Sequence, residues 1–223
     1  MPQEIKTISL SLPYRFGSVN CYLVKTGAGY FLIDTGYSNQ RAHLVKKLEN
    51  EGCRSGNLKL IIITHGDFDH TANAAHLRER FGAKIAMHPD DSGMAERGDM
   101  FWNREKGNIL IRKIVPVFFG LRKSDRFKPD LFIEDGYDFS EYGFDAEVCH
   151  IPAHSKGSIG ILTAGGDLFC GDLLTNRDKP VLNSIMDDSI AAHASIEKLE
   201  KLNVKTVYPG HGQPFPMDLW LKK

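Results

Sequence analysis

The chain has 223 residues, of which 42% are hydrophobic and 25% charged, with 28 basic residues balanced by 28 acidic ones. This composition is typical of a globular protein large enough to bury a substantial core. The balanced charge gives no electrostatic argument for nucleic acid or a membrane surface, so we expect neither as a partner. The N-terminus lacks the apolar core of a signal peptide, and no segment approaches the roughly 18 apolar residues of a membrane span. Four scattered cysteines without a C-x-x-C pair indicate reduced thiols, and we expect a cytoplasmic protein acting on a small-molecule substrate.

The first half of the chain alternates between strand and helix signals. Short β-branched or aromatic runs separated by Pro and Gly predict consecutive antiparallel strands at the N-terminus. Apolar residues at helical spacing then predict helices between the later strands. The expected strands are 5–12, 19–25, 30–34, 58–64 and 84–88, and the expected helices are 40–50 and 72–80.

The pattern breaks at 91–126, where charged and aromatic residues follow one another without a regular period. Strand signals then resume at 131–133, 146–151, 159–163, 168–170 and 206–208, with a helix at 190–202. A strand-rich chain with a helix after each half predicts an α+β fold of two sheets sandwiched between helices. We expect a single domain over 1–223 with an inserted, cap-like segment at about 91–126.

One short segment concentrates metal-ligand chemistry. His65, Asp67, Asp69 and His70 lie within six positions, directly after the apolar run 58–63. Burying so many polar groups is unfavourable unless something pairs them, and a metal ion pairs several at once. Three later segments also place a ligand type after a strand and beside a small residue, as expected where catalytic ions bind at converging strand ends. These later residues are His154, Asp172 and His211.

This order of residues resembles the metallo-β-lactamase superfamily, whose pattern is H-x-H-x-D-H, then a His, a bridging Asp and a final His. Ile33-Asp34-Thr35-Gly36 also matches the D-T-G turn of that family. The resemblance implies a four-layer αββα sandwich of two mixed β-sheets flanked by helices, with a dinuclear site at one edge. It implies that Asp34 supports the metal loop without touching the ions. The implied ligands are His65, Asp67 and His154 for one ion, Asp69, His70 and His211 for the other, and Asp172 for both.

Asp67 departs from the family pattern, because most members have histidine there and flavodiiron proteins have glutamate. Three carboxylates and a hydroxide would neutralise two divalent ions, where the usual set leaves one positive charge. A more anionic set of ligands weakens the metal as a Lewis acid and favours iron or manganese over zinc. We expect two divalent ions, with zinc first and iron or manganese as alternatives, or one ion if Asp67 weakens its side of the site.

The resemblance implies a metal-dependent hydrolase that uses a metal-bridging hydroxide to cleave a small ester, thioester, lactone or related substrate. Two ions about 3.5–4 Å apart can activate water and polarise the substrate together. Asp69 and Asp172 would be the catalytic carboxylates, with Asp69 orienting the nucleophile and moving its proton. The alternative is a non-haem diiron redox or oxygen-binding protein resembling the diiron domain of flavodiiron proteins. Against it, the chain ends at Lys223, soon after His211, with no flavodoxin domain.

The segment 91–126 is the candidate for substrate specificity. Its aromatic residues would make an apolar wall for a substrate. Equally, they would pack the insertion onto the domain or form the contact of a homodimer. These residues are Phe101, Trp102, Phe118 and Phe119. Arg104 would meet a substrate carboxylate or, as we expect, lie on a solvated charged face. His88 and His150 would at most line the cleft, and we expect neither to be a ligand.

Overall fold

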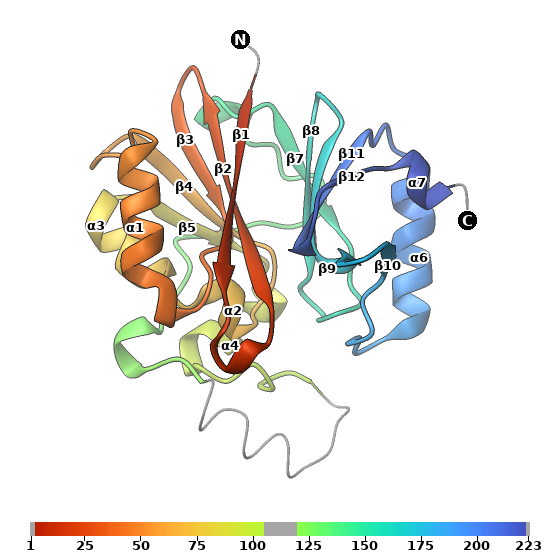
Figure 1. The fold of residues 1–223 in the computed structure, drawn as a ribbon, viewed down its shortest axis with the longest axis horizontal. Helices are drawn as coiled ribbons and strands as arrows, with labels where there is room; N and C mark the ends of the chain where they lie inside the picture. Colours follow the sequence, from red (N-terminus) through yellow and green to blue (C-terminus); the bar gives the residue numbers. More distant parts are fainter. Residues whose placement is uncertain (1–2, 105–119, 222–223) are drawn as a thin grey trace.

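The computed structural model describes residues 3–104 and 120–221. Two six-stranded sheets lie face to face, with helices on their outer sides (Figure 1). The predicted α+β sandwich is confirmed.

The first sheet contains β1 to β6 in sequence order. Its first three strands pair antiparallel, as predicted, and β3 to β6 pair parallel. The strands are β1 (Glu4–Ser11), β2 (Ser18–Thr26), β3 (Gly29–Ile33), β4 (Leu58–Ile63), β5 (Lys84–Met87) and β6 (Leu131–Phe132).

The second sheet has the order β12-β11-β9-β8-β7, with β10 paired to β9. β11 and β9 are parallel, and the remaining pairs are antiparallel. β9 and β11 extend beyond their predicted ends, and β10 and β12 were not predicted because two or three residues are too few to show alternation. The strands are β7 (Ala146–His150), β8 (Ile159–Thr163), β9 (Asp167–Asn176), β10 (Pro180–Leu182), β11 (Thr206–Gly212) and β12 (Phe215–Pro216).

Helices cover the outer faces of both sheets (Figure 1). α1 (Arg41–Asn50) and α3 (Ala74–Phe81) cover the first sheet, and α6 (Ser189–Glu200) and α7 (Asp218–Leu221) cover the second. α2 (Phe68–Thr71) and α4 (Pro89–Arg97) lie at one end of the first sheet. Short 3-10 helices occupy Pro13–Arg15, Ser38–Gln40, Lys123–Asp125 and Ser140–Tyr142.

The prediction that regular structure stops at residue 91 was wrong, because α4 runs to Arg97. Pro89 suits the first turn of a helix, and the His88 imidazole accepts a hydrogen bond from the Asp90 backbone N–H at 3.2 Å. The helix ends at Gly98, which adopts a left-handed φ of 72°. The apolar pattern was hidden because Asp91 is itself on the buried face.

The core has three layers, and β4 shows how a strand serves two of them. Ile62 faces the second sheet, whereas Ile61 and Ile63 face α1 and α3. Successive side chains of a strand point to opposite faces, so a strand covered on both sides is apolar throughout. A third apolar cluster lies between the second sheet and α6. All four cysteines lie buried as free thiols, and no helix in the described ranges is long and apolar enough to cross a membrane.

Polar contacts join the two sheets at one edge. Asn20 donates hydrogen bonds to the backbone carbonyls of Pro209 (3.1 Å) and Gly212 (2.7 Å). The Tyr22 hydroxyl donates to the same Pro209 carbonyl at 2.6 Å. β2 and β11 are thereby held together beside His211.

Candidate metal centre

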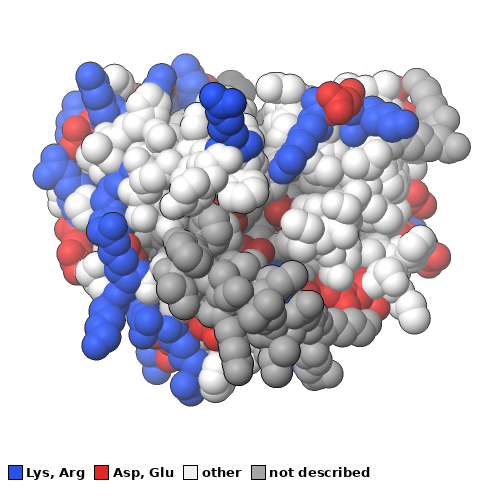
Figure 2. Space-filling view, turned by 60° about the horizontal axis from the view of Figure 1, so that its bottom comes forward, with Lys and Arg blue, Asp and Glu red and all other residues white. Residues whose placement is uncertain are grey.

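The structure brings all seven proposed ligands together at one edge of the sandwich. The first four lie just after β4 and in α2, Asp172 and His211 lie in strands of the second sheet, and His154 lies in the loop between β7 and β8. Figure 2 shows acidic side chains in the hollow of this face. All seven are buried: His65, Asp67, Asp69, His70, His154, Asp172 and His211. Asp172 and His211 lie inside β9 and β11, not after them as predicted.

The four imidazoles are each oriented by a bond from one ring nitrogen. Every Nδ1 faces an oxygen that accepts, so each ring in its neutral form keeps the lone pair on Nε2. Fixing one nitrogen in this way is typical of histidines that bind metal ions. The contacts are His65 to Thr64 Oγ1 (2.9 Å), His70 to Asp34 Oδ2 (2.8 Å), His154 to the Ile185 carbonyl (2.7 Å) and His211 to the Ser18 carbonyl (2.6 Å).

Ligand atoms form two groups of three. In each group, one ligand atom per residue lies within 4.8 Å of the other two. Asp172 faces both groups: it belongs to the group of His65 and His154, and its Oδ1 and Oδ2 lie 3.4 Å from His70 Nε2 and 3.3 Å from His211 Nε2 in the other. The groups are His65, His154 and Asp172, and Asp69, His70 and His211.

Several of these atoms have no hydrogen-bond partner. Among the described residues, His65 Nε2, His70 Nε2 and Asp172 Oδ1 are buried without one; Asp67 Oδ1 also lacks a hydrogen bond, but it forms an ion pair with Arg104 Nη2 at 2.9 Å. In addition, His154 Nε2 and Asp67 Oδ2 are 2.9 Å apart, although both are acceptors when the imidazole is neutral. Buried polar atoms are rarely left unpaired. Divalent cations would satisfy all of them, so the side chains fit a dinuclear metal centre.

The pKa values of the ligands in the metal-free centre also indicate a site for cations. Burial opposes protonation of His70 and His211, but the surrounding carboxylates raise the pKa of His70 to about 9 and that of His211 to about 11. The pKa of Asp172 lies well below its usual range, because the neighbouring His211 and His70 outweigh its burial. Burial and two neighbouring imidazoles instead lower the pKa of His65. The centre therefore attracts positive charge, which protons supply when metal is absent.

Asp34 ties the metal loop to the first sheet. Its Oδ1 accepts from the Thr64 backbone N–H at 2.9 Å, and its Oδ2 accepts from Thr64 Oγ1 and His70 Nδ1, both at 2.8 Å. Asp34 adopts a left-handed φ of 60°, a conformation that costs free energy for a residue other than glycine. The Asp34 carboxylate is thus held in one orientation, in direct contact with His70 and linked to His65 through Thr64.

Glycine at position 210 leaves room for the ligands. A Cβ built there would overlap Asp172 Oδ1 and come within 2.7 Å of His70 Cε1. At Gly171, a Cβ would come within 2.8 Å of Thr64 Oγ1. Larger residues at these positions would displace the ligands.

Asp91 is a residue that the sequence analysis missed. Its Oδ2 accepts from the Gly66 N–H (2.8 Å) and the Ser155 hydroxyl (2.6 Å), and its Oδ1 accepts from the Gly157 N–H (2.8 Å). This fully buried carboxylate joins the metal loop to the loop that carries His154. Nothing in the sequence marked it once α4 had been missed.

Arg104 was expected on a solvated face, and this expectation was wrong. It is 5% exposed and forms an ion pair with Asp67, with Arg104 Nη2 2.9 Å from Asp67 Oδ1. The sign of this contact in the sequence was the additional negative charge that Asp67 brings to the ligand set, which a nearby cation would offset.

The aromatic wall predicted in the insertion is only partly within the described residues. Trp102 packs on α4, with the Arg97 guanidinium 3.5 Å from its ring centroid, and is 48% exposed. Phe101 is half-buried, while Phe118 and Phe119 lie outside the described residues. The wall stays a prediction.

His88 and His150 lie apart from the seven ligands and stack on each other. Their ring centroids are 4.3 Å apart and their planes differ by 11°. With Asp90 they form a third group of metal-ligand types. Ring nitrogens of stacked parallel rings direct their lone pairs along separate planes, so this arrangement does not favour one shared ion.

Comparison with known proteins places this geometry in a family. The model of the metallo-beta-lactamase superfamily matches residues 14–211. The chain belongs to this superfamily.

Two relatives and one solved structure illustrate the similarity. Hydroxyacylglutathione hydrolase GloC of Haemophilus influenzae is 30% identical over 147 residues, covering 64% of this chain and 60% of the relative. A probable metallo-hydrolase of Methanocaldococcus jannaschii is 28% identical over 200 residues, covering 88% of each chain. The structure of TTHA1623 in a di-iron-bound form superposes with a TM-score of 0.71 at 26% identity, covering 96% of this chain and 97% of the other. The chain spans 58% and 60% of the length of two of its curated relatives.

Proposed function

We propose that this superfamily member is a hydrolase that depends on two divalent metal ions and cleaves a small ester, thioester, lactone or related substrate. The convergence of four oriented imidazoles on Asp172, two in its own ligand group and two within 3.4 Å of its oxygens, carries the proposal. Two ions held there would supply Lewis acidity and an activated water. No serine or cysteine nucleophile is needed for that chemistry.

Asp69 is the carboxylate that we assign to proton transfer. Its oxygens lie 3.5 Å from His211 Nε2 and 4.0 Å from His70 Nε2. Its side chain is 11% exposed, against 8% for Asp172, and it lies at the start of α2. There it can orient an attacking water and accept its proton, whereas Asp172 holds the two halves of the centre together.

Thioesters are the first substrates to test. One relative is named hydroxyacylglutathione hydrolase, and another, from Bos taurus, is named acyl-coenzyme A thioesterase MBLAC2 and is 26% identical over 216 residues. Both names describe cleavage of an acyl–sulfur bond, in which a thiolate leaves readily.

The test uses protein freed of metal, reloaded with zinc, manganese or iron, and assayed against panels of thioesters, esters and lactones. Turnover that requires metal, and that is lost in Asp69→Asn even when excess metal restores two ions per chain, supports the proposal. The partly exposed Glu49→Gln, which removes a surface ion pair with Arg80, is the matched control. Two bound ions without turnover of any substrate class would contradict it.

A second candidate is a diiron redox or oxygen-binding protein. The carboxylate at Asp67 and the similarity to a protein solved in a di-iron-bound form favour it. Oxygen consumption by the iron-loaded protein with a chemical electron donor would support this function over hydrolysis.

A further inference from the structure

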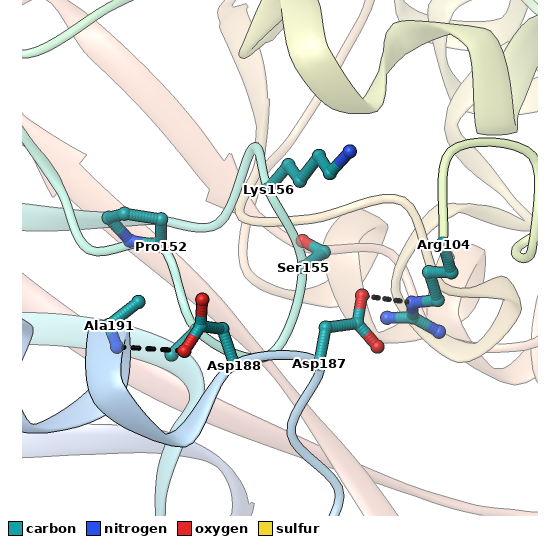
Figure 3. A pocket seen from close by; sticks show the side chains of 8 residues that line it. Arg104, Pro152, Ser155, Lys156, Asp187, Asp188 and Ala191 are labelled. Carbon is teal, nitrogen blue, oxygen red and sulfur yellow. Dashed lines mark hydrogen bonds and ion pairs between the residues drawn. The ribbon is translucent and has the colours of Figure 1, made fainter. Parts of the chain in front are cut away.

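Arg104 lies between the metal centre and a small cavity. The cavity has a volume of about 170 Å³ and is lined by Arg104, Ser155, Lys156 and Asp187 among others (Figure 3). Arg104 Nε donates to Asp187 Oδ2 at 3.0 Å, and Nη2 donates to the His154 carbonyl at 3.2 Å. Within the described ranges, its other ion pair is with Asp67. A buried guanidinium needs such partners, and its planar fork fixes their relative positions.

Asp67 is restrained at both oxygens. Oδ1 lies against Arg104, and Oδ2 lies 2.9 Å from His154 Nε2 and 4.0 Å from His65 Nε2. Only Oδ2 therefore faces the ligands of the first group. Asp67 can offer an ion in this group one oxygen, as a histidine would offer one nitrogen.

The ion pair between Arg104 and Asp67 also changes the net charge of the metal centre. Three carboxylates and one guanidinium carry two negative charges together, which equals the two carboxylates of the family set with histidine at position 67. Asp187 also contacts Arg104, but its side chain is 26% exposed, so solvent screens it more than Asp67, which is 8% exposed. The excess negative charge inferred from the sequence is thus offset from within the fold.

We propose that Arg104 is a positioning residue that makes Asp67 equivalent in charge and denticity to a neutral ligand, and so keeps the centre suited to zinc. The proposal rests on the metal centre of the proposed function and is independent of the reaction. Without Arg104, Asp67 would carry an unbalanced charge and free both oxygens. Oxygen-rich, more anionic sites favour harder ions such as manganese.

The experiment measures zinc and manganese affinities of metal-free protein by competition with a chromophoric chelator. Changes in residues that contact metal ligands alter metal affinity by about 10- to 100-fold. Arg104→Met is expected to shift the ratio of manganese to zinc affinity toward manganese by about tenfold or more. Arg104→Lys, which keeps the charge, should shift it less. The double variant Asp67→His with Arg104→Met should restore preference for zinc.

Two variants separate selectivity from mere support of the fold. Arg41 forms an ion pair with buried Asp125 at 2.8 Å, so Arg41→Met removes a comparable pair outside the centre. It should lower the unfolding temperature and leave the metal ratio unchanged. Arg80→Met, which removes a surface ion pair with Glu49, should leave both the unfolding temperature and the metal ratio unchanged.

Each other outcome has a distinct meaning. If Arg104→Met weakens both metals equally, or if the double variant does not recover zinc preference, Arg104 only supports the loop and the proposal is wrong. If Arg104→Met does not fold, the comparison of Arg104→Lys with the double variant decides in the same way. Wild-type protein that binds no ions would overturn the proposed metal centre itself.

Discussion

The two halves of the candidate centre are held in different ways. In the half with Asp69, His70 and His211, orientation comes from β2 and the turn after β3, through the Ser18 carbonyl and Asp34. In the other half, Asp67 and His154 are oriented by residues outside the strands, and only His65 is held from the first sheet, through Thr64 and Asp34. One half is therefore built into the sheets, whereas the other depends largely on loops and on α4. The supporting residues of the second kind are Asp91, Arg104 and Ile185.

The strongest way to break both halves at once is Asp172→Ala. Among the described residues, Asp172 is the carboxylate that faces both groups, so we expect loss of metal from both and loss of measurable hydrolysis. The fold should persist, because β9 is held by apolar contacts on both of its faces that do not involve this carboxylate. Elemental analysis and circular dichroism check the two expectations. Full turnover with two ions bound would contradict the bridging role.

Asp34→Asn should weaken the half with His70 most, because Asp34 contacts His70 Nδ1 directly, and the other half less, because Asp34 reaches His65 only through Thr64. Asparagine tolerates the left-handed backbone at this position, so the change removes charge with little strain. We expect metal affinity to fall by about 10- to 100-fold, with the greater loss at the His70 side. Comparison of stepwise binding constants with those of Arg104→Met tests whether the two changes affect different ions.

Asp91→Asn should weaken the half with Asp67 and His154 by destabilising the contact between the two loops that carry them. The amide cannot accept all three hydrogen bonds, and we expect a loss of about 2 kcal/mol in the free energy of unfolding. Urea denaturation of the metal-free protein measures it. A change below the error of the fit would mean that the loops are joined by other contacts.

Metal binding should depend on pH in the half that contains His70 and His211. Their pKa values of about 9 and about 11 lie above neutral pH, so both rings are protonated in metal-free protein at pH 7. Metal must displace these protons, and apparent affinity should rise by about tenfold per pH unit for each proton released. Above about pH 9, His70 is already neutral in the metal-free protein and no longer adds to the pH dependence of metal affinity. Calorimetry in buffers of different ionisation enthalpy counts the protons, and a count of zero would contradict this account.

Structure could be predicted from the sequence where a local pattern determines it. A continuous apolar run marked β4, and ligand types following strands named the seven residues that the structure brings together. The sequence analysis failed at Asp91 and Arg104, because nothing local to residue 104 shows that it meets Asp67. The length of β9 and β11 was also missed, since Gly171 and Gly210 look like chain breaks but make room inside strands.

The most direct test of the central claim is a crystal structure of metal-loaded protein with anomalous diffraction recorded at the zinc, iron and manganese edges. We predict two peaks, one among His65, Asp67, His154 and Asp172, and one among Asp69, His70, His211 and Asp172. Asp67 should reach its ion through Oδ2, with Oδ1 still on Arg104. A single peak, or an ion that has displaced Arg104 from Asp67, would contradict the account.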